Sequence, residues 1–341
     1  MTETRNRCAF LDAQHNLVVE NREVPVPGAD EVVVRVAANG ICGSDVHFYR
    51  EGKLGNFIVT TPYSPGHEAS GTIASAGAEV RNLPIGSPVV IEPGIPCGRC
   101  EYCRKGKYNL CEQVVFLSAP PIDGTFRDYV KIRADSVHLI PANMPLELGA
   151  LVEPTAVAVH AVRRAHFRPM DTAVIVGAGP IGLLTLQVFK AAGGGKAVCI
   201  DAVQERLDFA VRIGADETIL AGTANVPSSI ADVVFETAGS TRATAGLYRL
   251  ARAGGCVVQV GWPGDNIVPM DIAGFLEKEL TYVGVNRYAN AFPIAISMIA
   301  DNRIDVRSLI THRFPLDRIA EAFAFTVANQ KSVIKTLVTN N

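Results

Sequence analysis

The sequence predicts an α/β protein of two domains, the second built on a parallel sheet. Its length of 341 residues is typical of two domains. Up to about residue 140 the apolar runs are short, β-branched and separated by Gly, Pro and Asn, which indicates a β-rich domain with long loops. After Pro169, strand-like and helix-like runs alternate, as in a parallel sheet with crossover helices. Hydrophobic residues make up 48% and charged residues 19%, which excludes a disordered chain or a coiled coil.

These textures place the domain boundaries after residues 150 and 288. Residues 1–150 and 289–341 are expected to form the β-rich domain, and residues 151–288 the parallel-sheet domain. In the β-rich domain, the alternating run Glu31–Val36 is expected to form a strand. Leu146–Ala165 is expected to be helical, with a break tolerated near Pro154.

The second domain is expected to contain six strands and three helices. The strands are Thr172–Val176, Ala197–Ile200, Glu217–Leu220, Asp232–Phe235, Cys256–Val260 and Leu280–Val283. The helices are Pro180–Ala191, Gln204–Ile213 and Thr241–Arg252. Only about a dozen residues join the third and fourth strands, near the minimum for a parallel crossover, so that helix is expected to be vestigial or missing. The chain then continues with helices at Phe292–Ala300 and Leu316–Thr326 and strands at Leu309–Phe314 and Ser332–Val338.

The charge pattern argues against nucleic acid and anionic membranes as partners. The 32 Lys and Arg residues nearly balance the 34 Asp and Glu residues, and they form no basic stripe. Residues 1–14 are too polar for a signal peptide, and the most apolar stretch, Thr172–Val188, contains three glycines and a proline. We therefore expect a cytoplasmic protein, in which eight cysteines do not form a disulfide framework.

A glycine-rich turn between a predicted strand and a predicted helix is typical of a nucleotide-binding site. It contains Gly177, Gly179, Pro180, Ile181 and Gly182. The glycines let the backbone approach a pyrophosphate at the helix N-terminus. Nineteen residues after Gly182, Asp201 ends the next strand, where a carboxylate accepts the ribose hydroxyls and repels a 2′-phosphate. This favours NAD over NADP; the alternative is a turn that binds no cofactor. Arg206 either covers the adenine or is a solvated helix residue.

Four clustered cysteines predict a structural zinc site. Cys97, Cys100, Cys103 and Cys111 lie within fifteen residues, and four thiolates close a tetrahedral Zn²⁺ with no open position. Disulfides and inert core thiols are the alternatives. A zinc knuckle that binds nucleic acid is a further one, opposed by Glu101 and Glu112 and by the absence of an aromatic platform.

A second group of residues has the composition of a catalytic zinc site. Cys42, Ser44, Asp45 and His47 lie within six residues, and His67 and Glu68 follow as a pair. Glu153 lies in an apolar context, where a carboxylate needs a partner or a metal. One thiolate, one imidazole and one or two carboxylates leave an open position for water or substrate. Alternatively, Cys42 is a core thiol, the pair is a surface pair, and Ser44 and Asp45 cap a helix.

These motifs, in this order, resemble a known family. The runs CGSDVH and GHEASGTIASAG, the four cysteines and GAGPIG resemble the zinc-dependent medium-chain dehydrogenases, and more closely their sorbitol, xylitol and L-iditol dehydrogenase branch. The resemblance implies a GroES-like catalytic domain with a structural zinc lobe at about residues 93–113, around an inserted Rossmann domain, a doubly wound parallel sheet that binds the coenzyme.

The resemblance also assigns roles. It implies that Cys42, His67 and Glu68 hold the catalytic zinc, that Glu153 approaches it directly or through a water, and that Asp45 orients His67. Ser44 and His47 would pass the alcohol proton outward. The NAD-lining residues would include Ile181, Asp201, Arg206, Gly261, Trp262, Val285, Asn286 and Arg287.

The expected reaction is the reversible oxidation of a secondary alcohol of a polyol to a ketose, with two zinc ions per chain and NAD. The resemblance places Glu153, Arg287 and Tyr288 on the substrate side; the alternative for Arg287 and Tyr288 is a subunit interface. Phe48 stands where this branch usually has a tyrosine that touches the polyol. We expect a homo-oligomer, a tetramer rather than a dimer. The alternatives are an L-threonine 3-dehydrogenase, a general secondary-alcohol dehydrogenase, or a non-catalytic NAD-binding protein.

Overall fold

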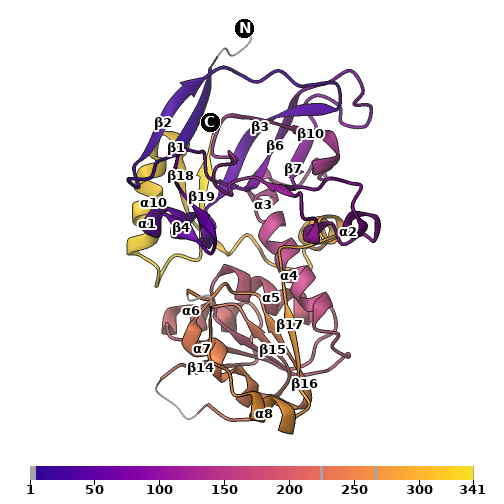
Figure 1. Ribbon diagram of the computed structural model, residues 1–341, viewed down its shortest axis with the longest axis vertical. Helices are drawn as coiled ribbons and strands as arrows, with labels where there is room; N and C mark the ends of the chain where they lie inside the picture. Colours follow the sequence, from indigo (N-terminus) through magenta and orange to yellow (C-terminus); the bar gives the residue numbers. More distant parts are fainter. Residues whose placement is uncertain (1–4, 223–225, 265–266, 341) are drawn as a thin grey trace. The chain divides into compact units, whose positions relative to one another are not determined.

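The structure, a computed structural model, describes residues 5–222, 226–264 and 267–340, which fall into two units (Figure 1). The first unit comprises Met1–Glu153, Ala295–Ala300 and Val306–Asn341, and the second comprises Pro154–Ile294 and Asp301–Asp305. The two main divisions therefore follow Glu153 and Ile294, whereas the sequence analysis places them after residues 150 and 288. The short segment Asp301–Asp305 also belongs to the second unit. In the described part of the chain, no helix is long and apolar enough to cross a bilayer.

The first unit is organised around β3 (Glu31–Gly40), which runs through a seven-stranded sheet. Strand β3 pairs antiparallel with three of the other strands, and β18 and β19 pair parallel. The order is β11-β7-β6-β3-β19-β18, with β10 also on β3. These strands are β6 (Glu68–Ala76), β7 (Pro88–Ile91), β10 (Tyr129–Arg133), β11 (Val137–Leu139), β18 (Ile310–Pro315) and β19 (Lys335–Thr339).

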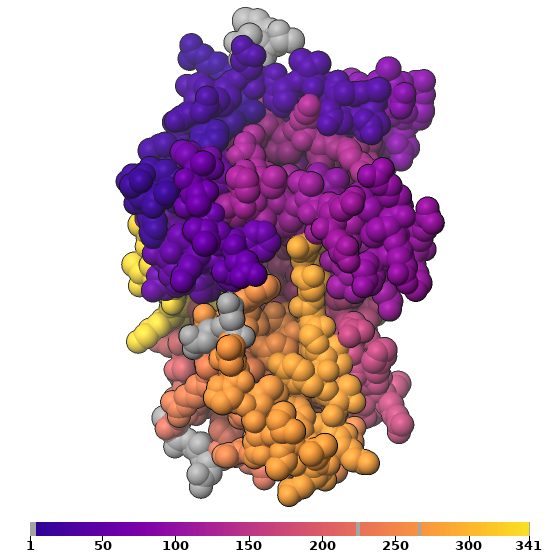
Figure 2. Space-filling model, viewed as in Figure 1, coloured from indigo at the N-terminus to yellow at the C-terminus, as the bar shows by residue number. Residues whose placement is uncertain are grey.

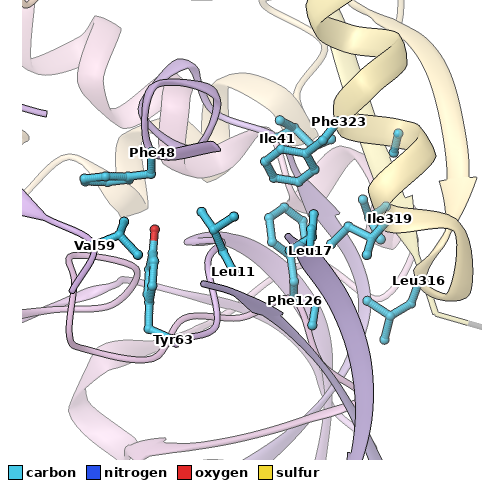
Figure 3. Packing of buried hydrophobic residues seen from close by; sticks show 13 residues of the cluster. Leu11, Leu17, Ile41, Phe48, Val59, Tyr63, Phe126, Leu316, Ile319 and Phe323 are labelled. Atoms are coloured by element: carbon cyan, nitrogen blue, oxygen red, sulfur yellow. The ribbon is translucent and has the colours of Figure 1, made fainter. Parts of the chain in front are cut away.

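Shorter elements surround this sheet and supply the loops that carry the site. They are β1 (Asn6–Leu11), β2 (Leu17–Arg22), α1 (Gly43–Glu51), β4 (Lys53–Leu54), β5 (Phe57–Ile58), β8 (Gly94–Ile95), α2 (Glu101–Arg104), η1 (Tyr108–Leu110), β9 (Val115–Phe116), η2 (Ala134–Ser136), α3 (Leu146–Gly149), η4 (Leu316–Arg318) and α10 (Ile319–Ala328). One apolar cluster joins α1 and α10 through Phe48, Tyr63, Phe126 and Phe323 (Figure 3). A second one packs Val32, Val34 and Val36 of β3 against β6 and β7.

The second unit is a six-stranded parallel sheet with the strand order β14-β13-β12-β15-β16-β17. The strands are β12 (Ala173–Val176), β13 (Ala197–Asp201), β14 (Glu217–Leu220), β15 (Ala231–Glu236), β16 (Ala251–Gln259) and β17 (Thr281–Gly284). The helices of the chain from residue 152 to residue 300 are α4 (Val152–Arg164), α5 (Pro180–Ala191), α6 (Gln204–Arg212), α7 (Thr241–Gly246), η3 (Leu247–Arg249), α8 (Ile272–Glu277) and α9 (Phe292–Ala300). The strand order reverses between β12 and β15, and ligands of open α/β sheets bind at such a reversal.

The expected elements are present, with two differences of detail. The helix expected over Thr241–Arg252 is divided into α7 and the 3-10 helix η3, which ends at Arg249, and β16 begins at Ala251, which pairs with Ala231. The helix expected over Leu146–Ala165 is divided into α3 and α4, and Pro154 lies in the first turn of α4. The short link between β14 and β15 agrees with the expectation, because no helix forms in it outside residues 223–225, which are not described.

Candidate functional site

The four clustered cysteines face one another in the loop between β8 and β9. The Sγ atoms of Cys100 and Cys103 are 3.4 Å apart, and those of Cys97 and Cys103 are 3.9 Å apart. Four thiolates around one tetrahedral zinc, with Zn–S bonds of about 2.3 Å, lie about 3.8 Å from each other. The ligand atoms of all four residues lie within 4.8 Å of one another. The side chains therefore have the separations that a closed Zn²⁺ site requires.

The electrostatics of this loop, the zinc lobe (residues 93–113), also fit a metal. The backbone amides of Arg99 and Cys100 lower the pKa of the Cys97 thiol to about 6, which favours its thiolate. Desolvation raises the pKa of Cys103 to about 12, with a contribution from its cysteine neighbours. A dication removes this conflict, because it stabilises all thiolates together.

A buried carboxylate ties the zinc lobe to the sheet. Glu92, directly after β7, accepts a hydrogen bond from the Tyr108 hydroxyl in η1 (2.9 Å) and lies 2.7 Å from Nε2 of His138 in β11. Glu92 is 6% exposed, so this anchor is shielded from water. The lobe lies at the side of the first unit, near the label α2 in Figure 1, and forms part of the surface seen in Figure 2.

The second cluster unites Cys42, His67 and Glu68. Cys42 is the N-cap of α1, two residues after the end of β3, and Glu68 begins the neighbouring strand β6, directly after His67. Their ligand atoms lie within 4.8 Å of one another, and both His67 and Glu68 are buried. The structure thus brings the three expected ligands together from residues 26 positions apart in the chain.

Asp45, which is fully buried, connects the two segments that carry these ligands. Its Oδ2 accepts the amide of Cys42 (3.0 Å), which completes a capping box at the start of α1, and its Oδ1 accepts the amide of Gly66 (3.2 Å). The same Oδ1 lies 3.8 Å from Nδ1 of His67. The carboxylate that caps α1 therefore also faces the imidazole, at a distance longer than a hydrogen bond.

Glu68 has a partner that the sequence did not indicate. Nζ of Lys335, on β19, lies 2.6 and 2.8 Å from the two carboxylate oxygens and 3.1 Å from the carbonyl oxygen of Ile41. The side chains of Lys335 and Glu68 are only 3% and 1% exposed. Burial lowers the pKa of Lys335, but attraction to Glu68 and Cys42 outweighs it, so that the net pKa is raised. Gly40 makes room for this carboxylate, since a Cβ there would lie 1.9 Å from Oε2 of Glu68.

The cluster is short of positive charge, which is the condition that favours a metal cation. Burial lowers the pKa of His67, yet Cys42, Asp45 and Glu153 together raise it well above its usual value. Nδ1 of His67 is buried without a hydrogen-bond partner among the described residues. Glu153 is buried at the start of α4, and it acts on His67 and Lys335 through its charge. A zinc ion held by Cys42, His67 and Glu68 fits this donor set.

The proposed relay residues lie on one face of α1. Ser44 and His47 are three positions apart in the helix, and such side chains are neighbours. The imidazole of His47 is 41% exposed and its Nδ1 lies 3.3 Å from Glu51. His47 is therefore in contact with solvent.

Phe48, by contrast, belongs to the apolar cluster of Figure 3. It is 4% exposed, and its ring meets Tyr63 edge to face with centroids 6.1 Å apart. The Tyr63 hydroxyl points toward the side of the cluster where Phe48 and Val59 lie (Figure 3).

In the second unit, the glycine-rich turn follows β12 and opens α5. Gly177 has φ 100°, a conformation that favours glycine, and a Cβ there would lie 2.8 Å from the amide of Ala238. A Cβ on Gly182 would lie 1.8 Å from the carbonyl oxygen of Gly177. The turn is therefore closed to larger residues, as in a cradle for a pyrophosphate.

Asp201 lies at the C-terminal end of β13, beside the turn. Its Oδ2 accepts the amide of Ala178 (2.6 Å) and its Oδ1 accepts that of Val203 (2.9 Å). Both bonds fix the carboxylate, whose remaining lone pairs are available to ribose hydroxyls. Arg206 is half-buried, with its Nη1 3.9 Å from the position of a Cβ on Gly179, so it lies against the turn.

The remaining residues expected to line NAD follow β16 and β17. Gly261 is in close contact with Glu236, since a Cβ there would lie 2.5 Å from its Oε2. Glu236 is fully buried, and it accepts the amides of Ala238 and Gly239 and the side chain of Gln259. It therefore connects the ends of β15 and β16, and the sequence reasoning missed it. Trp262 is 54% exposed.

The segment after β17 begins with Val285, whose amide donates to the carbonyl of Gln259 (2.9 Å), followed by the exposed Asn286. Arg287 has φ 53° and is half-buried, and burial lowers its pKa. Tyr288 is 3% exposed and packs on Phe292 with ring centroids 5.3 Å apart.

Comparison with known proteins agrees with this geometry. Residues 28–142 match the family described as alcohol dehydrogenase GroES-like domain, and residues 180–301 match the family described as zinc-binding dehydrogenase. A sorbitol dehydrogenase of Bacillus subtilis is 36% identical, over 98% of this chain and 97% of its own. A probable D-xylulose reductase A of Aspergillus clavatus is also 36% identical, over 99% and 97% of the two chains.

Solved structures show the same fold. L-idonate 5-dehydrogenase from Escherichia coli superposes with a TM-score of 0.93, at 28% identity and 98% coverage of both chains. A short chain alcohol dehydrogenase from E. coli, complexed with NADH, gives 0.91 at 28% identity and covers 98% of this chain and 99% of its own. A zinc-binding dehydrogenase from Sinorhizobium meliloti, bound to NADP, gives 0.90 at 29% identity and covers 99% and 100%.

The relatives that match over nearly the full length, together with the two matching domain families, identify the family of this chain. The chain belongs to the zinc-containing medium-chain alcohol dehydrogenase family, and it combines a GroES-like domain with a Rossmann-like domain.

Proposed function

We propose that this protein oxidises a secondary hydroxyl of a sugar alcohol to the ketone, reversibly, with NAD as the hydride acceptor. The observation that carries the proposal is the buried cluster of Cys42, His67 and Glu68, in a chain that also has a fixed Asp201 beside a glycine-rich turn. Two relatives support this substrate class by their names, sorbitol dehydrogenase and probable D-xylulose reductase A. These names refer to a six-carbon polyol and a five-carbon ketose.

The residues of the chain supply the proton path in this proposal. When bound, the catalytic zinc supplies a Lewis acid that lowers the pKa of the alcohol. Ser44 accepts the hydroxyl proton and His47, one turn further along α1, passes it to solvent, for which its 41% exposure is favourable. Asp45 keeps the imidazole of His67 in one orientation while the proton leaves. Glu153 contributes negative charge to the cluster, either directly or through a water.

NAD is preferred to NADP in this proposal because of Asp201. The phosphate of NADP would bring negative charge against a carboxylate that two backbone amides hold in place. Family members bind either coenzyme, as the NADH and NADP complexes among the similar structures illustrate. Gly261, Trp262 and the segment Val285–Arg287 are assigned to the nicotinamide side. The protein is proposed to act in the cytoplasm as a homo-oligomer, a tetramer rather than a dimer.

Polyol selectivity is assigned to Glu153, Arg287 and Tyr288, since rejection of a simple alcohol requires polar groups that such an alcohol leaves unpaired. Phe48 offers no hydroxyl, so discrimination among five- and six-carbon polyols is expected to be loose. The competing functions within the family are oxidation of L-threonine and of simple secondary alcohols. The competing function outside it is coenzyme binding without catalysis.

One experiment separates these functions. Zinc content is measured first, and NADH formation is then followed at 340 nm with sorbitol, xylitol, L-iditol, L-threonine, 2-butanol and ethanol. The proposal predicts the highest kcat/KM for a polyol. A preference for threonine or for a simple alcohol would move the protein to another branch. Coenzyme binding with no turnover of any substrate, by protein with a full zinc complement, would favour the non-catalytic function.

A further inference from the structure

Besides the segments that carry Cys42 and His67, a third segment contacts the catalytic cluster. Its contacts are made by Phe116 and Ser118. The segment is a four-residue turn, Phe116–Ala119, closed by a hydrogen bond from the amide of Ala119 to the carbonyl of Phe116 (3.1 Å). Phe116 at its start lies against the ring of His67, with centroids 5.6 Å apart. Ser118 is the third residue of the turn and is 3% exposed. Neither residue was singled out by the sequence analysis.

The hydroxyl of Ser118 is held in one orientation by its two partners. The amide of Gly66 donates to Oγ (2.9 Å), and Oγ lies 2.9 Å from Oδ1 of Asp45. Because a carboxylate only accepts, the hydroxyl proton must point to Asp45. Oδ1 of Asp45 is the atom that faces Nδ1 of His67, at 3.8 Å. Ser118 thus holds, together with the amide of Gly66, the oxygen of Asp45 that faces the imidazole.

The backbone of Ser118 has a conformation that its side chain does not favour. Its φ is 72°, in the left-handed region, where glycine is unstrained and other residues are disfavoured. The third position of a turn with this φ is normally taken by Gly or Asn. A serine there is strained, and its buried hydroxyl makes two hydrogen bonds directed at the metal cluster.

We propose that Ser118 is a positioning residue for the catalytic zinc, acting through Asp45 on His67. The proposal rests on the catalytic zinc site of the proposed function. The hydroxyl keeps Oδ1 of Asp45 in place, so that Nδ1 of His67 faces that oxygen and Nε2 is left for the metal. Without the hydroxyl, the carboxylate keeps the amides of Cys42 and Gly66 but loses its third donor, and the imidazole loses its fixed orientation.

The test compares Ser118→Ala and Ser118→Gly with the wild type in the full-length zinc protein. The measured quantity is the dissociation constant of the chelatable zinc, obtained by competition with a chromophoric chelator and calibrated by elemental analysis. Loss of a residue that supports a metal ligand weakens metal binding about 10- to 100-fold, and we expect this loss for both variants. Ser136→Ala is the matched control, because Ser136 is 4% exposed and its Oγ is 3.5 Å from Asp135, outside the metal cluster.

The two variants separate the hydroxyl from the turn. Glycine adopts the φ of residue 118 without strain, so Ser118→Gly should unfold at a higher urea concentration than Ser118→Ala. If the hydroxyl is what matters, both variants lose the same affinity for zinc despite this difference in stability. Wild-type zinc affinity in Ser118→Gly would overturn the proposal, since it would show that residue 118 serves only the turn.

A double-mutant comparison tests the path through Asp45. In an Asp45→Asn background, Ser118→Ala should change the zinc dissociation constant by less than about threefold, because the atom that it positions has been altered. The full loss in that background would mean that Ser118 acts through Gly66 and would overturn the proposed path. If wild-type protein holds only the thiolate-bound zinc, the catalytic site itself is wrong; if it holds two ions and the variants bind zinc normally, only the role of Ser118 is wrong.

Discussion

Removing the ammonium group of Lys335 should destabilise the protein strongly, and zinc should reduce that effect. Lys335→Met keeps most of the side-chain volume but leaves the Glu68 carboxylate without the partner that lies 2.6 Å away. Both side chains are almost completely buried, at 3% and 1% exposure. Removal of one partner from such a pair costs about 3–5 kcal/mol, because a desolvated charge is left uncompensated. This is a large part of the stability of an ordinary domain.

The assay is urea unfolding at pH 7, followed by circular dichroism, with and without the chelatable zinc. In protein without that ion, Lys335→Met should lose about 3–5 kcal/mol of the free energy of unfolding. With the ion bound, Glu68 has a second cation as partner, so the loss should be smaller. Lys131→Met is the control: Lys131 forms an ion pair with Glu31 at 3.2 Å with its side chain 43% exposed, so we expect at most about 1 kcal/mol.

Two results would refute this reasoning. A loss below about 1 kcal/mol without zinc would mean that Glu68 is not left as an uncompensated charge. An equal loss with and without zinc would mean that the carboxylate does not reach the metal. The double variant Lys335→Met with Glu68→Gln, which removes both charges, should recover much of the stability.

Three further predictions concern the metal, the coenzyme and the substrate. Elemental analysis of protein purified without added metal should find two zinc ions per chain, and one ion per chain would eliminate one site. A chelator should remove the catalytic ion first, because the four-thiolate site has no open position. Asp201→Ala should weaken NAD binding and shift the ratio of kcat/KM values for NAD and NADP by about 1–3 kcal/mol toward NADP, whereas an unchanged ratio would mean that the carboxylate serves only the amides of Ala178 and Val203. Arg287→Ala should lower kcat/KM for the best polyol by about 2–3 kcal/mol with little effect on 2-butanol, and equal losses on both substrates would assign Arg287 to the coenzyme or the fold.

The sequence was most informative where the chemistry is local. The four cysteines and the glycine-rich turn lie within short segments, so their spacing alone indicates their geometry. The sheet of the second unit was also predictable, because its central strands are largely apolar runs of four to six residues. The helix expected over Thr241–Arg252 was too long only at its end, where helical structure stops at Arg249 and Ala251 pairs with Ala231 in the sheet.

The partners of the metal ligands could not be predicted in the same way. Lys335 is 267 positions from Glu68, and a lysine in a short strand is normally exposed, so nothing in the sequence pattern pointed to a buried pair. Ser118 lies in a loop of small and apolar residues whose backbone conformation is not encoded by a recognisable turn motif. Glu236 ends a strand as many acidic residues do, and its two backbone partners depend on how the following loop folds back.

Gly40 restricts the local sequence in a way that a list of ligands does not reveal. The Glu68 carboxylate occupies the space that a Cβ atom at position 40 would need. Such a Cβ would lie 1.9 Å from Oε2 of Glu68. The direction of the carboxylate is thus encoded partly by an atom missing from the neighbouring strand. Positions 40 and 68 should therefore change together in a selection of random variants. A larger residue at position 40 should survive only beside a shorter side chain at position 68, in a protein whose metal has lost that ligand.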